Sequence, residues 1–343
     1  MKRLAAVCFT RHGALLLRQL QQKLSGWEMD AYTTKKLSAD AGLPSYEGRL
    51  ADWAELQFKQ ADGILFVGAL GIAVRAIAPM VSSKKTDPAV VVLDEKGDFC
   101  ISVLSGHLGG ANRLTHEVAQ AVGAVPVITT ATDRNEKFSV DQWAGEHGCT
   151  LLGWDNAKEF AAWILDGGKA GLVSRFPVEG TIPEELTGQN ASIGIAVTLD
   201  EQDHPFEKTV QLIPKTVVLG IGCRKGTQKQ VICQQVTEAL KCHKISPLAV
   251  SRVATIDLKA EEPGLLEFCR EQGWELVCYS AEELSKAKGE FTPSAFVSQI
   301  TGVDNVCERA ASLASGGKQL FPKQKGNGVT VSAGLEPFQV LFE

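Results

Sequence analysis

One histidine stands among glycines at the point where an apolar run of the sequence ends. Residues 105–110 read SGHLGG, follow the apolar run 99–104 (FCISVL) and precede a helical pattern over 108–122. Imidazole gains and loses a proton near neutral pH, so His107 is a candidate general acid or base. Ser105 is a weaker candidate for a nucleophile, because the stretch lacks the G-x-S-x-G spacing of a nucleophile elbow.

The backbone around His107 offers a second kind of chemistry. Glycine lets a backbone approach a bound group closely, and the start of a helix exposes N–H groups at the positive end of the helix dipole. Such a turn suits a phosphate or carboxylate, and its N–H groups stabilise negative charge on a carbonyl oxygen under attack. The candidates for binding in this turn are Gly106, Gly109, Gly110 and Asn112.

Two further stretches combine an apolar run, glycines and a helical pattern, at residues 66–79 (FVGALGIAVRAIAP) and 218–231 (VLGIGCRKGTQKQV). They add the binding candidates Gly68, Gly71, Arg75, Gly222, Arg224, Lys225 and Thr227. The second stretch also predicts a helical capping box between Thr227 and Gln230. A purely structural role, as tight strand-to-helix turns, is the alternative for all three stretches.

Nucleotide cofactors do not fit these glycines. Gly220, Gly222 and Gly226 follow a G-x-G-x-x-x-G spacing instead of the dinucleotide-binding G-x-G-x-x-G. No acidic residue stands about 20 positions later to hold a ribose. Lys225 precedes the last glycine, whereas the lysine of a phosphate-binding loop follows it. We therefore predict no NAD or ATP site.

Other polar residues are expected at the same edge as His107. Open α/β sheets bind ligands beyond the carboxyl ends of their strands. His12 follows the first predicted strand and Asp133 with Arg134 follow another, so all three could reach this edge. Asp133 and Arg134 would look identical as helix caps or linker residues. His116 lies nine residues after His107, half a turn around a helix, so the two do not share a metal and we predict no metal site.

Continuous apolar runs alternate with helical patterns, which predicts α/β domains whose sheets are covered on both faces. We expect a three-layer N-terminal α/β domain (1–133), a smaller α/β middle domain (134–214) and a three-layer C-terminal α/β domain (215–343). The expected strands are 4–10, 63–69, 89–94, 99–104, 170–176, 191–199, 216–222, 248–257, 275–280 and 328–334. The expected helices are 51–60, 108–122, 157–165, 227–242, 264–272 and 304–314.

The composition argues against several classes of protein. A net charge of −5 disfavours general nucleic-acid binding, and no apolar run reaches the roughly 18 residues of a membrane span. The nine cysteines are scattered and include no CxxC pair, which disfavours a disulfide frame or a zinc site. Reduced thiols indicate a cytoplasmic protein. We take these side chains, including Cys223, as small apolar filler.

Several long stretches together resemble one known family. They are 68–79 (GALGIAVRAIAP), 101–112 (ISVLSGHLGGAN), 127–144 (VITTATDRNEKFSVDQWA), 217–227 (VVLGIGCRKGT), 256–268 (IDLKAEEPGLLEF) and 302–315 (GVDNVCERAASLAS). In this order they resemble the cobalt-precorrin-5A hydrolase family of the anaerobic cobalamin pathway. The resemblance covers nearly the whole chain and is weakest over about 141–214.

The resemblance implies a reaction. A δ-lactone on a cobalt corrinoid is opened by water, and a two-carbon fragment leaves as acetaldehyde to give cobalt-precorrin-5B. The small-molecule substrate carries the cobalt, so no nicotinamide, ATP or protein-bound metal is implied. His107 would act as the general acid or base, and the glycine turns with Arg224 and Lys225 would hold ring carboxylates. The oligomeric state is open, with a homodimer as a candidate.

Two other functions are compatible with these residues. A corrinoid-ring methyltransferase of the same pathway would need an adenosylmethionine pocket. A non-enzymatic corrinoid carrier would use the glycine turns only to hold anions. Retention of adenosylmethionine would identify the first, and release of acetaldehyde separates a hydrolase from the second.

Overall fold

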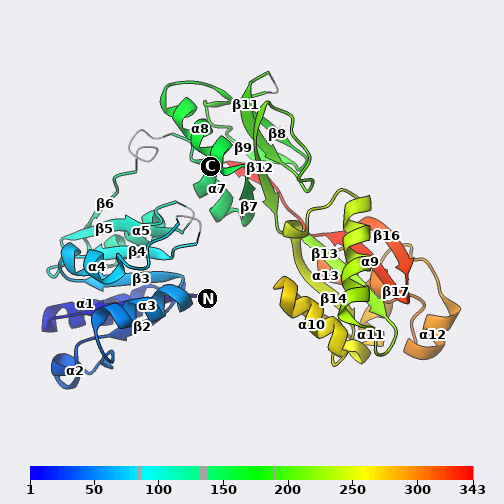
Figure 1. Ribbon diagram of the computed structural model, residues 1–343, viewed down its shortest axis with the longest axis horizontal. Helices are drawn as coiled ribbons and strands as arrows, with labels where there is room; N and C mark the ends of the chain where they lie inside the picture. The colour runs from blue at the N-terminus through cyan, green and yellow to red at the C-terminus, as the bar shows by residue number, and fades with distance from the viewer. Residues whose placement is uncertain (84–85, 108, 131–136, 189, 343) are drawn as a thin grey trace. The chain divides into compact units, whose positions relative to one another are not determined.

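The computed structural model of the chain describes residues 1–83, 86–107, 109–130, 137–188 and 190–342 (Figure 1). The chain divides into two compact units, Met1–Glu146 and His147–Glu343, and each is considered by itself. Both are α/β, which confirms the predicted fold class. The domain boundaries proposed after residues 133 and 214 stay predictions.

The first unit is built on a six-stranded sheet in the order β2-β1-β3-β4-β5-β6. Its strands are β1 (Lys2–Cys8), β2 (Trp27–Tyr32), β3 (Gly63–Val67), β4 (Ala89–Leu93), β5 (Phe99–Leu104) and β6 (Val125–Val127). Strands β1 to β4 are parallel, β5 is antiparallel to β4, and β6 is parallel to β5. The sheet therefore contains two opposite strand directions.

Helices cover both faces of this sheet and make it a three-layer structure. They are α1 (Arg11–Lys23), α2 (Lys35–Ala41), α3 (Leu50–Gln60), α4 (Leu70–Ile77) and α5 (Ala111–Val122), and the short helix α7 (Val140–Glu146) ends this unit. Alternate strand residues point to opposite faces: Leu4 and Ala6 pack against α1 and α5, whereas Ala5 and Val7 pack against α3 and α4. Burial on both sides explains the continuous apolar runs of β3 and β4.

The strand directions overturn one prediction about the site. The segment between β4 and β5 is a tight reversal at residues 94–98, with Gly97 in the left-handed region (φ 77°). The glycine turn after β5 consequently lies at the edge of the sheet where β1 to β4 begin. His12 and the turn containing Gly68 follow parallel strands and lie at the opposite edge. The expectation that His12 shares an edge with His107 is wrong.

The second unit begins with a five-stranded sheet in the order β10-β8-β11-β12-β7, with α8 (Trp154–Leu165) packed on it. Its strands are β7 (Cys149–Leu152), β8 (Ala170–Ser174), β10 (Leu186–Thr187), β11 (Ile193–Val197) and β12 (Lys208–Pro214). Near the end of the chain, β18 (Val340–Phe342) pairs with β9 (Val178–Gly180) (Figure 1).

The rest of the second unit is another three-layer structure, with strand order β15-β14-β13-β17-β16. The strands are β13 (Val217–Cys223), β14 (Val250–Ile256), β15 (Glu275–Tyr279), β16 (Lys318–Gly326) and β17 (Val329–Leu335). The helices are α9 (Lys229–Cys242), α10 (Pro263–Gln272), α11 (Ala281–Ser285), α12 (Ala295–Thr301) and α13 (Cys307–Ser315), with short 3-10 turns at Pro247–Ala249 and Asp257–Lys259. Helices α9 and α10 cover one face, and α11 and α13 the other. Throughout the described residues, no helix combines the length and apolar character needed to cross a membrane.

Candidate active site

The glycine turn between β5 and α5 is closed tightly on itself. Ser105 adopts the left-handed conformation (φ 58°), and Gly110 does so as the N-cap of α5 (φ 83°). A Cβ atom added to Gly109 would lie 2.4 Å from the Cβ of Ser105, and one added to Gly106 would lie 2.7 Å from Oδ1 of Asn112. A side chain at Gly109 would clash with Ser105 and one at Gly106 with Asn112, which explains the two glycines.

Three N–H groups of this turn are already used inside it. The Ala111 N–H donates to the Ser105 carbonyl (3.0 Å), that of Asn112 to Gly106 (2.9 Å), and that of Gly110 to His107 (2.9 Å). These groups satisfy the turn and are not donors to a substrate oxyanion in this conformation. What the turn does achieve is to hold the backbone of His107 in place at the rim of the sheet.

His107 is oriented by a carboxylate and a hydroxyl. Its Nδ1 lies 3.2 Å from Oδ1 of Asp141 and 3.2 Å from Oγ of Ser139, and the Ser139 hydroxyl donates to Asp141 (2.8 Å). The side chains of His107 and Asp141 are only 11% and 16% exposed. A carboxylate can only accept hydrogen bonds, and the Ser139 hydroxyl donates its hydrogen to that carboxylate. Neither group can therefore donate to Nδ1, so Nδ1 of neutral His107 carries the hydrogen. The lone pair then belongs to Nε2, the arrangement of a histidine base backed by a carboxylate.

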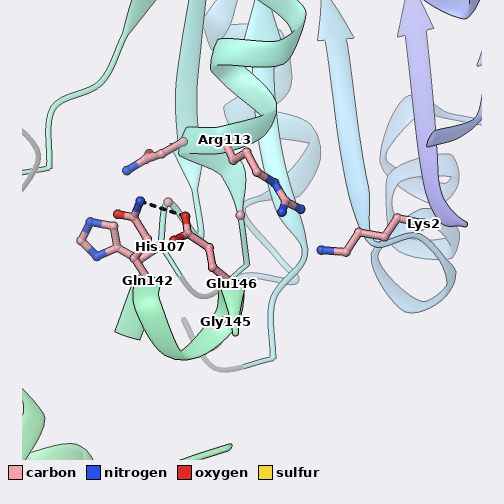
Figure 2. A pocket seen from close by; sticks show the side chains of 9 residues that line it. Lys2, His107, Arg113, Gln142, Gly145 and Glu146 are labelled. Carbon is pink, nitrogen blue, oxygen red and sulfur yellow. Dashed lines mark hydrogen bonds between the residues drawn. The ribbon is translucent and has the colours of Figure 1, made fainter. Parts of the chain in front are cut away.

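A small cavity of about 30 Å³ lies beside His107 (Figure 2). It is lined by Lys2, Gly106, His107, Gly110, Asn112, Arg113, Gln142, Gly145 and Glu146. Gln142 and Glu146 come from α7 and share a hydrogen bond (3.1 Å), while Arg113 and Lys2 bring positive charge from α5 and the start of β1. The volume suits one or two water molecules, given polar partners on its walls.

Ser105 lies outside this arrangement. The residue is 9% exposed, its Oγ has no hydrogen-bond partner among the described residues, and it does not line the cavity. A nucleophilic serine needs a base within hydrogen-bond reach. The geometry therefore gives Ser105 a backbone role, in which its left-handed conformation turns the chain from strand to helix.

The remaining candidate residues of the first unit lie in different parts of it. Asn112 is 4% exposed and braces the site, because it accepts a hydrogen bond from Ser102 (2.7 Å) and donates to Thr130 (3.1 Å). Gly68, Gly71 and Arg75 lie at the opposite edge of the sheet, where the Arg75 guanidinium folds back onto the Gly71 carbonyl (3.2 Å). Asp133 and Arg134 fall outside the described residues.

The third glycine turn lines a separate, larger pocket of about 1230 Å³ that lies wholly within the second unit. Gly222, Arg224 and Lys225 face it, whereas Gly220 serves packing, since a Cβ there would lie 1.8 Å from the Cys307 carbonyl at the start of α13. The predicted capping box is wrong. The N-cap of α9 is Gln228, with no side-chain capping bond, and the Thr227 hydroxyl donates to the Arg224 carbonyl instead (2.7 Å).

Five of the nine cysteines (Cys8, Cys100, Cys149, Cys269 and Cys307) are buried, as expected of apolar filler, whereas Cys242 is exposed. All nine cysteines are free, and burial raises the pKa of Cys100, Cys149 and Cys269 to about 12, although the charge of Asp94 also contributes at Cys100 and Cys278 at Cys269. Cys223 lines the large pocket with its pKa raised, chiefly by burial. In the part of the chain that the structure describes, no three His, Cys, Asp or Glu side chains gather into a metal-binding group.

Sequence reasoning did not single out Ser139, Asp141, Gln142, Glu146 or Lys2. Ser139 and Asp141 stand at the start of α7, where Ser-x-Asp is typical of an ordinary helix N-terminus. Their partner His107 is 32 residues away from Ser139, so no local spacing signals the contact. Lys2 reaches the cavity only because β1 begins at the edge where β5 ends.

Comparison with known proteins gives consistent results along the chain. Three family models match: "Cobalamin synthesis G N-terminal" over residues 52–133, "Cobalamin biosynthesis central region" over 138–214 and "Cobalamin synthesis G C-terminus" over 217–334. The cobalt-precorrin-5A hydrolase of Salmonella typhimurium is 34% identical over 97% of each chain. That of Priestia megaterium is also 34% identical, over 97% of this chain and 95% of its own.

One solved structure aligns along the same length. It is the crystal structure of a putative cobalamin biosynthesis protein G homolog from Sulfolobus solfataricus, with a TM-score of 0.44 at 20% identity over 97% of both chains.

Proposed function

Because the chain belongs to the cobalamin synthesis G family, we propose that it is a cobalt-precorrin-5A hydrolase with its catalytic centre at His107. The observation that carries the activity is the 34% identity to two cobalt-precorrin-5A hydrolases over 97% of this chain. The contact of His107 with Asp141 beside a water-sized cavity supports the choice of centre. Neither a carrier nor a methyltransferase is favoured by these relatives.

In the first stage His107 activates water. With its hydrogen on Nδ1, His107 accepts a proton from water at Nε2, and the hydroxide attacks the lactone carbonyl. Asp141 stabilises the imidazolium that forms, and the small cavity has room for the attacking water molecule. Lys2 and Arg113, the latter 3.4 Å from Glu117, line the cavity, and we assign to them the electrostatic stabilisation of the oxyanion of the tetrahedral intermediate.

In the second stage the same histidine first donates a proton to the leaving oxygen and then accepts one from the alcohol. Collapse of the intermediate breaks the carbon–oxygen bond of the lactone and gives a carboxylate and an alcohol. Removal of the alcohol proton lets the adjacent carbon–carbon bond break. The oxygen electrons form the aldehyde C=O, the bonding pair moves into the ring, and His107 returns the proton that it took from the alcohol. We assign both transfers to His107, as a general acid and base.

The finer assignments are proposals of the same kind. We assign the catalytic role to His107 and a positioning role to Ser105, Gly106, Gly109, Gly110 and Asn112. Arg224 and Lys225 are assigned to substrate carboxylates. We expect the reaction to need no cofactor beyond the cobalt that the substrate carries. A cytoplasmic location and a homodimeric assembly are the corresponding expectations for the whole protein.

Acetaldehyde release tests the proposed function. The purified protein, freed of small molecules, is incubated with cobalt-precorrin-5A, and acetaldehyde is measured against the loss of substrate. Equal amounts of the two without added nucleotide are expected. Binding without release would instead indicate a carrier, and strict dependence on NAD or ATP would overturn the mechanism.

A further inference from the structure

The large pocket of the second unit has a construction of its own, and we call it the C-terminal pocket. It lies between the turn after β13, the segment that leads into α10, the starts of α12 and α13, and the hairpin of β16 and β17. Its volume of about 1230 Å³ exceeds the roughly 300–1,000 Å³ of an ordinary small-molecule site. A tetrapyrrole-sized ligand fits a space of this order.

Positive charge dominates the lining of the C-terminal pocket. The cationic side chains are Arg224, Lys225, Lys259, Lys323 and Lys325. Lys259 is paired with Glu262 (2.8 Å), and the ammonium group of Lys323 donates to the Thr292 carbonyl (2.6 Å). Arg224, Lys225 and Lys325 are exposed and form no salt bridge with a described residue, although the charge of Lys225 also acts on Glu262. Three cations from two facing segments are thus available to a ligand.

The backbone of the turn is not the anion site that its glycines predict. The Gly226 N–H donates to the Glu262 carboxylate (2.7 Å), and the Arg224 N–H donates to the Gly328 carbonyl (3.1 Å). A nucleotide phosphate would seek such N–H groups in a tight cradle. Anion recognition in this pocket therefore depends on long side chains. Such side chains suit a large ligand with several separated anionic groups better than they suit a single compact phosphate.

Apolar surface accompanies these cations. Leu258 is 63% exposed and Ile300 is 61% exposed, and both line the pocket together with Val297 and Val306. Exposed apolar groups beside a concave surface mark a binding site for an apolar body. The ligand that matches both features is a broad ring with apolar faces and carboxylates at its periphery.

We propose that the C-terminal pocket binds a cobalt corrinoid through its free peripheral carboxylates, with Arg224, Lys225 and Lys325 as the principal contacts. This inference deepens the proposed function, since it assigns substrate recognition to a pocket separate from His107. Amidation or esterification of the carboxylates removes the charge that these side chains recognise. The pocket therefore favours a corrinoid polyacid over its amidated forms.

The test measures binding alone, on the full chain. Equilibrium dialysis, followed by corrin absorbance, gives the Kd of cobyrinic acid, whose carboxylates are free, and of cobinamide, in which they are amides. The triple variant Arg224→Gln, Lys225→Gln, Lys325→Gln removes the three cations. The matched control Lys241→Gln, Arg270→Gln, Lys318→Gln removes the same charge from exposed positions of the same unit outside the pocket.

We expect cobyrinic acid to bind more tightly than cobinamide, and the pocket triple variant to raise its Kd about tenfold or more. The control and His107→Asn should stay within about twofold of the parent. An unchanged Kd in the pocket variant, or equal Kd values for the two corrinoids, would overturn the inference. Acetaldehyde release by the parent protein is measured separately. If the pocket variant binds normally but the parent releases acetaldehyde, the pocket inference is wrong and the proposed hydrolase activity is kept. If the corrinoid binds specifically but no acetaldehyde is released, the pocket inference is kept and the proposed activity is wrong.

Discussion

At the scale of single residues, Asp141 decides which nitrogen of His107 carries the hydrogen. Its carboxylate lies 3.2 Å from Nδ1 and accepts the hydrogen of the Ser139 hydroxyl, so Nδ1 faces two acceptors, carries the hydrogen itself and leaves Nε2 as the base. Ser139 supports this choice by donating to the carboxylate (2.8 Å). The site therefore depends on a hydrogen-bond direction as well as on a distance.

Replacement of Asp141 by Asn tests this direction. An amide can donate to Nδ1 and so favour the other tautomer of His107, in which Nε2 carries the hydrogen. We expect kcat for acetaldehyde release to fall by about 10–10³-fold with KM little changed. Asp155→Asn is the control, because Asp155 occupies the first turn of α8 as Asp141 does in α7. An equal effect of the two substitutions would mean that Asp141 acts only on its helix.

At the scale of elements, the strand-to-helix turn after β5 sets the position of His107. Gly109→Ala should displace it, since the new Cβ would lie 2.4 Å from the Cβ of Ser105 and 2.8 Å from its carbonyl oxygen. We expect a loss of about 1–3 kcal/mol in the free energy of unfolding, measured by urea denaturation, and a lower kcat. Gly26→Ala, where nothing lies within 4 Å, should change neither. A Gly109→Ala variant with parental kcat would show that the turn does not position the catalytic group.

A second element depends on a buried carboxylate. Glu262 joins the start of α10 to the turn after β13 through the Gly226 N–H, and it also pairs with Lys259 of the preceding 3-10 turn. Burial alone would raise the pKa of Glu262, but these hydrogen bonds and the neighbouring Lys259 and Lys225 charges outweigh it and lower that pKa. The charged form therefore stabilises the fold above the ordinary glutamate pKa of about 4.3, and the contribution disappears as the pH falls through the lowered value.

Glu262→Gln should consequently reduce the free energy of unfolding by about 1–2 kcal/mol at pH 7. The difference from the parent should shrink as the pH falls below about 4, because both proteins then carry a neutral side chain there. Denaturation by urea at pH 7 and in acid measures both quantities. A difference that is constant with pH would show that the carboxylate charge contributes nothing to this contact.

The elements also show how far sequence patterns reach. Apolar runs covered on both faces, such as β3, β4 and β13, were predictable because burial leaves only apolar residues in them. The reversal at residues 94–98 was not recognised, so the direction of β5 and the edge that holds His107 were mistaken. His107 and Asp141 lie far apart in the sequence, and so do Gly226 and Glu262. Contacts between such distant residues leave no local sequence pattern that could predict them.

At the scale of the whole molecule, we infer that an acidic chain binds an acidic substrate through a local concentration of cations. The net charge is −5, yet Arg224, Lys225 and Lys325 gather in one pocket. The double variant Arg224→Ala, Lys225→Ala should raise KM about tenfold and leave kcat nearly unchanged, the pattern of lost uniform binding. Added salt should raise KM in the parent and matter less in the variant. An unchanged KM at low salt would remove these residues from substrate binding.

The most direct test of the central claim is the kcat of His107→Asn for acetaldehyde release from cobalt-precorrin-5A. The substitution removes the proposed proton-transfer group and leaves unchanged the residues of the second unit that we propose to bind the corrinoid. The account predicts a kcat lower by about 10²–10⁴-fold with corrinoid binding largely intact. A variant that binds the corrinoid and releases acetaldehyde at close to the parental rate would contradict it and place the chemistry elsewhere.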